Sequence, residues 1–263
     1  MDINCLVFNE FETLDLFGAV EVLGQVEECC IKYFSINGGK IINKDNVQIM
    51  TENINRIEKY EVLFIPGGKG TRILVNDNKF VQKLKIVAEK SLWCLTVCTG
   101  SALLAKTGLL DHCEATSNKM AFEWVKTNGK NVKWKYDARW AADKKYYTSS
   151  GISAGIDMSL GFVCDRFGEE KAKEIAKKME YEWKNNPNLV LLSIDEYNSL
   201  LETNYLLSNK ANAEHLQKSI EQHKSGKIKK KNCTKIDKLF IERAWNDYLY
   251  WIETDKKTDE TEK

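Results

Sequence analysis

The sequence predicts an α/β domain in which helices cover both faces of a parallel β-sheet. Short apolar segments rich in β-branched and aromatic residues alternate with longer segments whose apolar residues recur every three or four positions. Such alternation is typical of βαβ units, and therefore of a parallel sheet. The length, 263 residues, is enough for one large α/β domain or for an ordinary domain with an appendage.

Strands and helices alternate along the chain up to Pro187, the second of only two prolines. The short apolar runs predict strands at Ile3–Phe8, Ile31–Ile36, Val62–Ile65, Leu92–Val97, Val132–Trp134 and Tyr146–Thr148. The segments with helical spacing predict helices at Leu14–Val26, Lys79–Lys90, Ser101–Lys106, Lys119–Thr127, Ser153–Phe167 and Glu169–Trp183. Active sites of such sheets lie at the carboxyl ends of the strands, so the residues that follow each strand are the first candidates.

The pattern changes after Pro187 into a mostly helical C-terminal tail. One strand-like run, Leu189–Ser193, is followed by predicted helices at Ile194–Leu207, Asn209–Lys224 and Phe240–Ile252. A lysine-rich linker separates the last two, and the polar end TDKKTDETEK is predicted to be disordered. We therefore expect an α/β domain at 1–187, a strand with helices at 188–227, and a linker, helix and disordered end at 228–263.

The composition argues against several kinds of partner. The formal net charge is +1, so we expect neither nucleic acid nor a membrane surface as a partner. We find no apolar segment of membrane-spanning length and no signal-peptide pattern. The eight cysteines include no CxxC pair and the three histidines stand apart from them, so we expect no metal and no cofactor. Cysteines within apolar segments suit reduced thiols in the cytoplasm.

The stretch LTVCTGSALLAKTG is the strongest candidate for chemistry. Cys98 ends an apolar strand, and a turn of small residues leads at once into a helix. Such a turn projects the side chain out of the sheet, and the helix N-terminus lowers the pKa of a cysteine. From these residues alone two readings remain equally open: a nucleophile, or a buried structural cysteine with Ser101 capping the helix.

Two further segments favour the nucleophile. FIPGGKG places Gly67 and Gly68 after a buried strand, where backbone N–H groups can point into a site as an oxyanion hole requires; a plain turn is the alternative. Asp15 lies among apolar residues at the start of a helix, where it either matches the charge of the helix end or faces Cys98. In the second case the pKa of Asp15 would rise, and it could share a proton with the thiol.

Four segments, in this order and spacing, carry a family resemblance: LDLFGAVEVL, FIPGGKG, LTVCTGSALLAKTGLLD and TSSGISAGIDMSLGFV. They resemble the ThiJ/PfpI superfamily over residues 1–183, and the VCTGS elbow with the Asp of LDL is most similar to its isonitrile (isocyanide) hydratase branch. The resemblance implies a flavodoxin-like, class I glutamine amidotransferase-like fold, a homodimer and a small-molecule substrate. The site residues that it implies are Cys98 as nucleophile, Asp15 as its proton partner, and Gly67, Gly68, Thr99, Gly151 and Ile152 around them.

The resemblance also implies a reaction. In isocyanide hydration the thiolate attacks the isocyanide carbon, and the carboxyl group helps to protonate the adduct and to activate water, giving an N-substituted formamide. The sequence departs from several members of the superfamily. Thr99 stands where the peptidase-like members carry a histidine, and Asn118 stands where many superfamily members carry one. A Cys–His dyad is therefore missing, which argues against proteolysis. His112 is predicted to be a solvated turn residue.

The tail carries a second resemblance. Residues 189–227 resemble the C-terminal half of a YefM/Phd-type antitoxin, which implies a YoeB/Txe-type toxin as a partner. Residues 235–257 resemble the first strand and helix of such a toxin without its catalytic residues, so we expect no ribonuclease activity. An antitoxin-like segment followed by a toxin-like segment favours a gene fusion or frame error over a functional C-terminal module. The simpler alternative is an amphipathic helical tail that packs on the main domain or on a dimer partner.

Three functions stay open from the sequence. The leading hypothesis is a cysteine-dependent enzyme that hydrates an isocyanide, with a glyoxalase-like reaction on a small dicarbonyl as the alternative in the same site. The second is a redox sensor or regulator that uses Cys98. The third is a toxin-binding protein that acts through residues 189–227.

Overall fold

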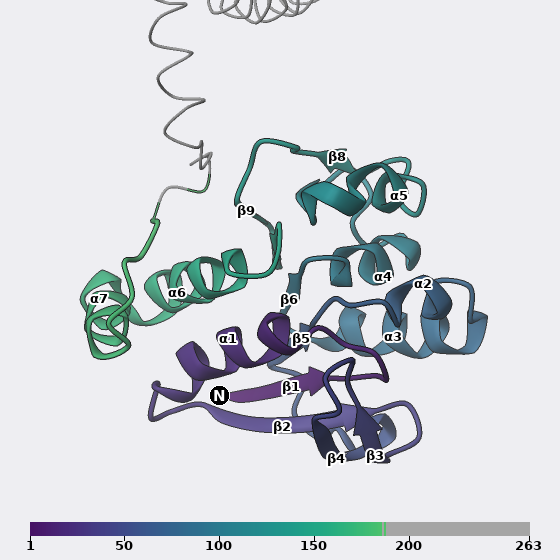
Figure 1. The fold of residues 1–263 in the computed structure, drawn as a ribbon, viewed down its shortest axis with the longest axis horizontal. Helices are drawn as coiled ribbons and strands as arrows, with labels where there is room; N and C mark the ends of the chain where they lie inside the picture. The colour runs from purple at the N-terminus through teal and green to yellow at the C-terminus, as the bar shows by residue number, and fades with distance from the viewer. Residues whose placement is uncertain (186, 188–263) are drawn as a thin grey trace, which may run out of the picture. The chain divides into compact units, whose positions relative to one another are not determined.

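The structure is a computed structural model that describes residues 1–185 and 187 (Figure 1). Its centre is a sheet built from eight strands: β1 (Asp2–Leu6), β2 (Cys30–Ser35), β3 (Gly39–Ile42), β4 (Gln48–Asn53), β5 (Val62–Ile65), β6 (Trp93–Val97), β9 (Trp140–Asp143) and β10 (Tyr146–Ser149). They lie in the order β3-β4-β2-β1-β5-β6-β10-β9. Two short strands, β7 (Glu114–Ala115) and β8 (Lys133–Trp134), pair with each other in a separate parallel sheet.

The inner strands of the main sheet all run parallel. β4, β2, β1, β5, β6 and β10 pair in parallel, while β3 and β9 are antiparallel strands at the two edges. The predicted α/β, flavodoxin-like class is therefore confirmed. Because the carboxyl ends of parallel strands meet at one edge of the sheet, the loops after β1, β5, β6 and β10 lie together.

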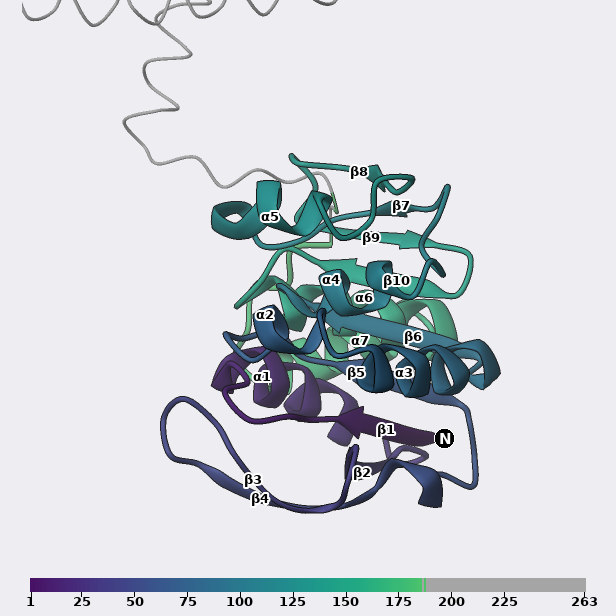
Figure 2. The ribbon, with the colours of Figure 1, turned by 90° about the vertical axis from the view of Figure 1, so that its right-hand side faces the viewer.

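Helices cover both faces of the sheet (Figures 1 and 2). They are α1 (Thr13–Gly24), α2 (Thr71–Leu74), α3 (Asn78–Lys90), α4 (Gly100–Lys106), α5 (Phe122–Lys126), α6 (Ala154–Phe167) and α7 (Glu169–Lys178). Strand β6 shows the two faces: Val97 packs against Gly155 of α6, whereas the Cys94 thiol lies 3.6 Å from the Ala88 carbonyl oxygen of α3. The helices that follow β1 and β10 thus share one face, because α1 also packs along α6.

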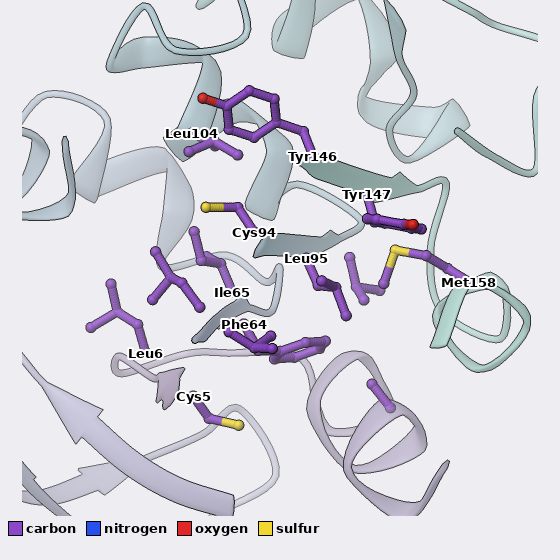
Figure 3. Close-up of a cluster of buried hydrophobic side chains, with 14 of the residues drawn as sticks. Cys5, Leu6, Phe64, Ile65, Cys94, Leu95, Leu104, Tyr146, Tyr147 and Met158 are labelled. Atoms are coloured by element: carbon purple, nitrogen blue, oxygen red, sulfur yellow. The ribbon is translucent and has the colours of Figure 1, made fainter. Parts of the chain in front are cut away.

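The core fills both sides of the parallel strands. Figure 3 shows Cys94 beside Leu104 and Tyr146, while Leu95 points to the other side, toward Tyr147 and Met158. All six side chains are buried. Alternate residues of one buried strand thus pack into opposite layers, which holds the ends of the strands in fixed positions.

Several predicted elements differ from the structure. The β3–β4 hairpin and β9 were not predicted, because these short strands contain exposed residues, such as Lys40, Gln48 and Ala142, which break the apolar pattern of a buried strand. The strand predicted at 132–134 is β8, outside the main sheet. The helix predicted at 119–127 is a 3₁₀ turn, Lys119–Ala121, followed by α5.

The last predicted helix of the domain is also shorter than expected. α7 ends at Lys178 instead of Trp183, and Glu180 adopts a left-handed φ of 50° that breaks the helix. The elements predicted after Pro187, with the divisions 188–227 and 228–263, lie outside the described residues. In the described part of the chain, no helix has the length and apolar character to cross a membrane.

Candidate active site

Cys98 lies at a sharp turn between β6 and α4. Its φ of 56° is left-handed, a conformation that residues other than glycine seldom adopt. The turn is fixed by its backbone: the Cys98 N–H donates to the Ser149 carbonyl oxygen (3.1 Å). The Cys98 carbonyl oxygen accepts from the hydroxyls of Ser101 (3.0 Å) and Ser117 (2.8 Å). The Cys98 side chain is therefore held in place at the end of the sheet, with only 7% of the residue exposed.

Asp15 lies beside Cys98 and is fully buried. One carboxylate oxygen, Oδ2, accepts from the Gly67 N–H at 3.2 Å, whereas Oδ1 is buried and has no hydrogen-bond partner in the structure. Gly67 lies where three segments meet. A Cβ added to it would be 2.7 Å from Asp15 Oδ2, 2.7 Å from the Thr99 nitrogen and 2.8 Å from the Cys98 Cβ. A side chain at residue 67 would therefore push the carboxylate and the elbow apart.

Thr99 links the elbow to the loop after β5. Its hydroxyl oxygen accepts from the Gly68 N–H (3.0 Å) and lies 3.1 Å from the Thr71 hydroxyl. The N–H groups of Gly67 and Gly68, predicted as oxyanion donors, are thus both bonded to side chains of the site, those of Asp15 and Thr99. In this structure they orient the site side chains instead of pointing free into the site.

The loop after β10 covers the thiol. Gly151 has a φ of 121°, and a Cβ on it would lie 3.0 Å from Cys98 Sγ and 3.2 Å from Asn118 Nδ2. The glycine backbone therefore packs directly against the sulfur. Asn118 accepts from the Ala121 N–H through Oδ1 (3.1 Å), so it caps the 3₁₀ turn and supplies no base. Ile152 follows the glycine, with 43% of the residue exposed.

Burial controls the protonation of Cys98. It raises the pKa of the thiol, the negative charge of Asp15 raises it further, and the N–H and hydroxyl of Thr99 oppose both effects. The expectation that the helix end lowers the pKa of Cys98 is therefore wrong, because loss of hydration outweighs the hydrogen bonds that Thr99, at the start of the helix, donates to the sulfur. The resting group is the neutral thiol.

Asp15 has an unusually high pKa for a carboxyl group. Burial raises the pKa of Asp15 to about 7, against hydrogen bonds from Cys98 and Gly67 that lower it. The nearby negative charge of Glu12 also raises it. Asp15 therefore exchanges its proton in the neutral range, where a general acid or base works best.

This raised pKa makes a prediction about stability. A carboxyl group whose pKa is higher in the folded state stabilises the fold fully at low pH, and that contribution is lost as the pH rises from about 4 to about 7. Relative to Asp15→Asn, the free energy of unfolding of the wild type should fall by about 3 kcal/mol between about pH 5 and pH 8. Urea unfolding at both pH values measures the difference; a constant difference would contradict the raised pKa.

Sequence reasoning missed several residues of this site. Ser117 and Ser149 hold the backbone of Cys98, and Thr71 holds the hydroxyl of Thr99. Ser117 comes from a distant turn that no motif marks, whereas Ser149 lies within the segment TSSGISAGIDMSLGFV but carried no predicted role. Thr71 follows FIPGGKG directly, so its position was the one available signal. Among residues 1–185 and 187, no three His, Cys, Asp or Glu side chains are grouped to hold a metal ion.

Comparison with known proteins assigns the chain to a family. The model of the DJ-1/PfpI family matches residues 1–164, more than half of the chain. The chain belongs to the DJ-1/PfpI family. Isonitrile hydratase of Pseudomonas putida is 26% identical over 183 residues, which are 69% of this chain and 78% of that protein. The superfamily predicted from the four segments is therefore confirmed.

A solved structure of the DJ-1/PfpI family agrees with the fold. The crystal structure of a ThiJ/PfpI family protein from Pseudomonas syringae superposes with a TM-score of 0.64 at 23% identity, covering 81% of this chain and 89% of that one. At this identity the similarity supports the fold alone.

A second family model matches the end of the chain. The model described as Antitoxin Phd_YefM, type II toxin-antitoxin system, matches residues 183–226. Antitoxin YefM of a Synechocystis strain is 60% identical over 50 residues, 19% of this chain, which spans 58% of that antitoxin. The predicted antitoxin-like segment is therefore confirmed, while the resemblance of residues 235–257 to a toxin stays a prediction.

Proposed function

We propose that this DJ-1/PfpI protein is a cysteine-dependent enzyme that adds water to isocyanides. The observation that carries the proposal is the buried pair of Cys98 and Asp15, in which the Oδ1 atom of Asp15 has no protein partner. A buried polar atom without a partner is costly, and such atoms are kept where a ligand or a proton uses them. The similarity to an isonitrile hydratase supports the same chemistry.

The reaction moves the thiol proton to the substrate carbon, and the two protons of water to the substrate nitrogen and to the sulfur. The Cys98 sulfur forms a bond to the isocyanide carbon, and its proton passes through Asp15 to the same carbon, giving a thioimidate. Water then adds to this carbon while one of its protons passes to the nitrogen; as the carbon–sulfur bond breaks, the other proton of the water passes to the sulfur. The products are an N-substituted formamide and the free thiol, so atoms and charges balance without a cofactor.

The direction of the pKa shifts suits this sequence of steps. A neutral thiol beside a carboxylate keeps the charge of the resting site at one unit, and Asp15 accepts the thiol proton as the sulfur attacks. An isocyanide carries no net charge, so its binding beside the Asp15 carboxylate brings no second charge into the site. Thr99 supports the sulfur at this stage, because its N–H and hydroxyl favour the thiolate.

A small-substrate panel tests the proposal. We expect a simple alkyl isocyanide to give the matching formamide, whereas a glyoxalase-like enzyme would convert a small dicarbonyl into a hydroxy acid. Both products are identified by NMR in one series, with heat-treated protein as the blank. Hydroxy acid without formamide would replace the proposal with the glyoxalase alternative.

The redox-sensor hypothesis is weaker in this structure. Oxidant-sensing cysteines are ionised and accessible, whereas Cys98 is buried and its pKa is raised. We also propose that the protein works as a homodimer in the cytoplasm, where a reducing environment keeps the thiol free. Both points are inferences from the family resemblance and the cysteine usage.

A second function follows from the antitoxin-like segment. We propose that residues 189–227 bind a YoeB/Txe-type toxin, as the match to antitoxin YefM suggests. Co-expression of the full chain with a catalytically inactive toxin of this type tests it. Co-purification is expected, and it should be lost when residues 189–227 are deleted; recovery of free toxin alone would refute the binding.

A further inference from the structure

A buried ion pair lies close to the Cys98 site. Asp157 of α6 is fully buried, and the side chain of Arg139 is 10% exposed. The Arg139 Nε and Nη2 atoms both lie 2.6 Å from Asp157 Oδ2. Two buried charges persist only when further hydrogen bonds compensate for their lost hydration, so the other partners of this pair are informative.

Arg139 holds both ends of the loop that covers Cys98, residues 150–153. Its carbonyl oxygen accepts from the Ser150 N–H at 2.8 Å, and its Nη2 donates to the Ser153 hydroxyl at 3.3 Å. Gly151 lies between these two contacts and packs against the Cys98 sulfur. Arg139 thus contacts both ends of the loop that packs on the thiol, one end through its backbone and the other through its side chain.

Asp157 holds the segment that leads into the antitoxin-like region, residues 181–185. The Tyr181 hydroxyl donates to Oδ2 (3.1 Å), and the Lys184 N–H donates to Oδ1 (2.8 Å). The Trp183 indole N–H donates to the Asp157 carbonyl oxygen (3.3 Å). Both oxygens of this carboxylate are thus used, and two of its three partner residues, Tyr181 and Lys184, come from the segment in which the antitoxin family match begins.

Arg139 contacts the same end of the domain. Its N–H donates to the Pro187 carbonyl oxygen at 2.7 Å. A continuous set of hydrogen bonds therefore runs from Tyr181, through Asp157 and Arg139, to the loop over Cys98.

We propose that Arg139 and Asp157 are positioning residues that hold the 150–153 loop against Cys98, and that residues 181–185 complete this clamp. Binding at the antitoxin-like region that pulls on these residues would then change the reactivity of Cys98. The inference rests on the proposed function only in taking Cys98 as the reacting group; it does not depend on the isocyanide.

Alkylation of the full-length protein by iodoacetamide tests the clamp. The rate at Cys98 is followed by peptide mass spectrometry beside the rates at Cys5 and Cys94, two fully buried thiols of the core. Asp157→Asn should accelerate alkylation of Cys98 about tenfold, because a hydrogen-bonded charge pair is lost. Global loosening of the fold would accelerate Cys5 and Cys94 as well, so their unchanged rates separate positioning from stability.

If Asp157→Asn folds poorly, substitutions of Arg139 and Tyr181 that remove fewer interactions test the same proposal. Arg139→Lys should restore part of the protection that Arg139→Met removes, since lysine keeps the charge but not the planar set of donors. Tyr181→Phe should give a smaller increase, about threefold, because it removes one hydrogen bond and no charge. Lys173→Met, in a surface ion pair of α7, is the control and should change nothing.

Two results would overturn the clamp. One is an unchanged Cys98 rate in the Arg139 and Asp157 variants, and the other is an equal acceleration at all three thiols. Both results come from alkylation rates, so they do not depend on whether the protein converts an isocyanide. If the wild type makes no formamide while Cys98 alone is accelerated, the proposed reaction fails and the clamp stands.

Discussion

Cys98→Ala is expected to abolish formamide production from an isocyanide, lowering kcat/KM by at least about 10⁴-fold. The reason is that the sulfur forms the bond to the substrate carbon, and no other thiol is among the residues found around Asp15. The fold should survive, because the substitution removes one atom from a turn fixed by the backbone. Formamide release is measured by NMR, with circular dichroism as the check on folding.

The matched control is Cys30→Ala, which alters an exposed thiol on β2 and should leave the rate within about twofold. Cys98→Ser separates chemistry from packing, since it keeps the shape of the elbow but offers a much weaker nucleophile. Full turnover in either Cys98 variant would remove the cysteine from the mechanism.

Asp15→Asn is expected to lower kcat/KM by about 10² to 10⁴, the usual contribution of a general acid or base. In the wild type, the carboxylate form must accept the thiol proton. Since the pKa of Asp15 is raised to about 7, the rate should therefore rise as the pH increases through about 7 and level off above it. The asparagine variant should lose this rise. Initial rates between about pH 5 and pH 9 measure both effects.

Glu12→Gln provides the internal check on this pH dependence. The negative charge of Glu12 raises the pKa of Asp15, so its removal should move the acid limb of the rate profile to lower pH. The maximal rate should change little, because Glu12 lies outside the Cys98–Asp15 pair. An acid limb that stays in place in Glu12→Gln, or that persists in Asp15→Asn, would assign it to another group.

The sequence predicted this site because its principal residues follow strand ends. Cys98 comes after β6, Gly67 after β5, and Asp15 shortly after β1, and parallel strands bring such positions to one edge. The short apolar strands at the centre of the sheet could be identified for the same reason. The edge strands β3 and β9 could not, because Gly39 and Lys40 of β3 and Ala142 of β9 are exposed and the apolar pattern weakens there.

The protonation of the site could not be predicted from local sequence. The turn after β6 indicated a helix end and a lowered thiol pKa, but the pKa of Cys98 depends on how completely other segments bury it. The role of Asp157 was equally hidden. An aspartate in an apolar helix gives no sign of its partner, and Arg139 lies in an irregular loop of the chain, at the start of β9.

The most direct test of the account is a search for the covalent adduct on Cys98. Wild-type protein is mixed with an isocyanide, quenched at short times, digested, and the peptides are weighed. We predict a transient peptide in which Cys98 carries the mass of one isocyanide molecule, decaying at the rate at which formamide appears. Formamide released at the full rate with Cys98 unmodified at every time would contradict covalent catalysis by this cysteine.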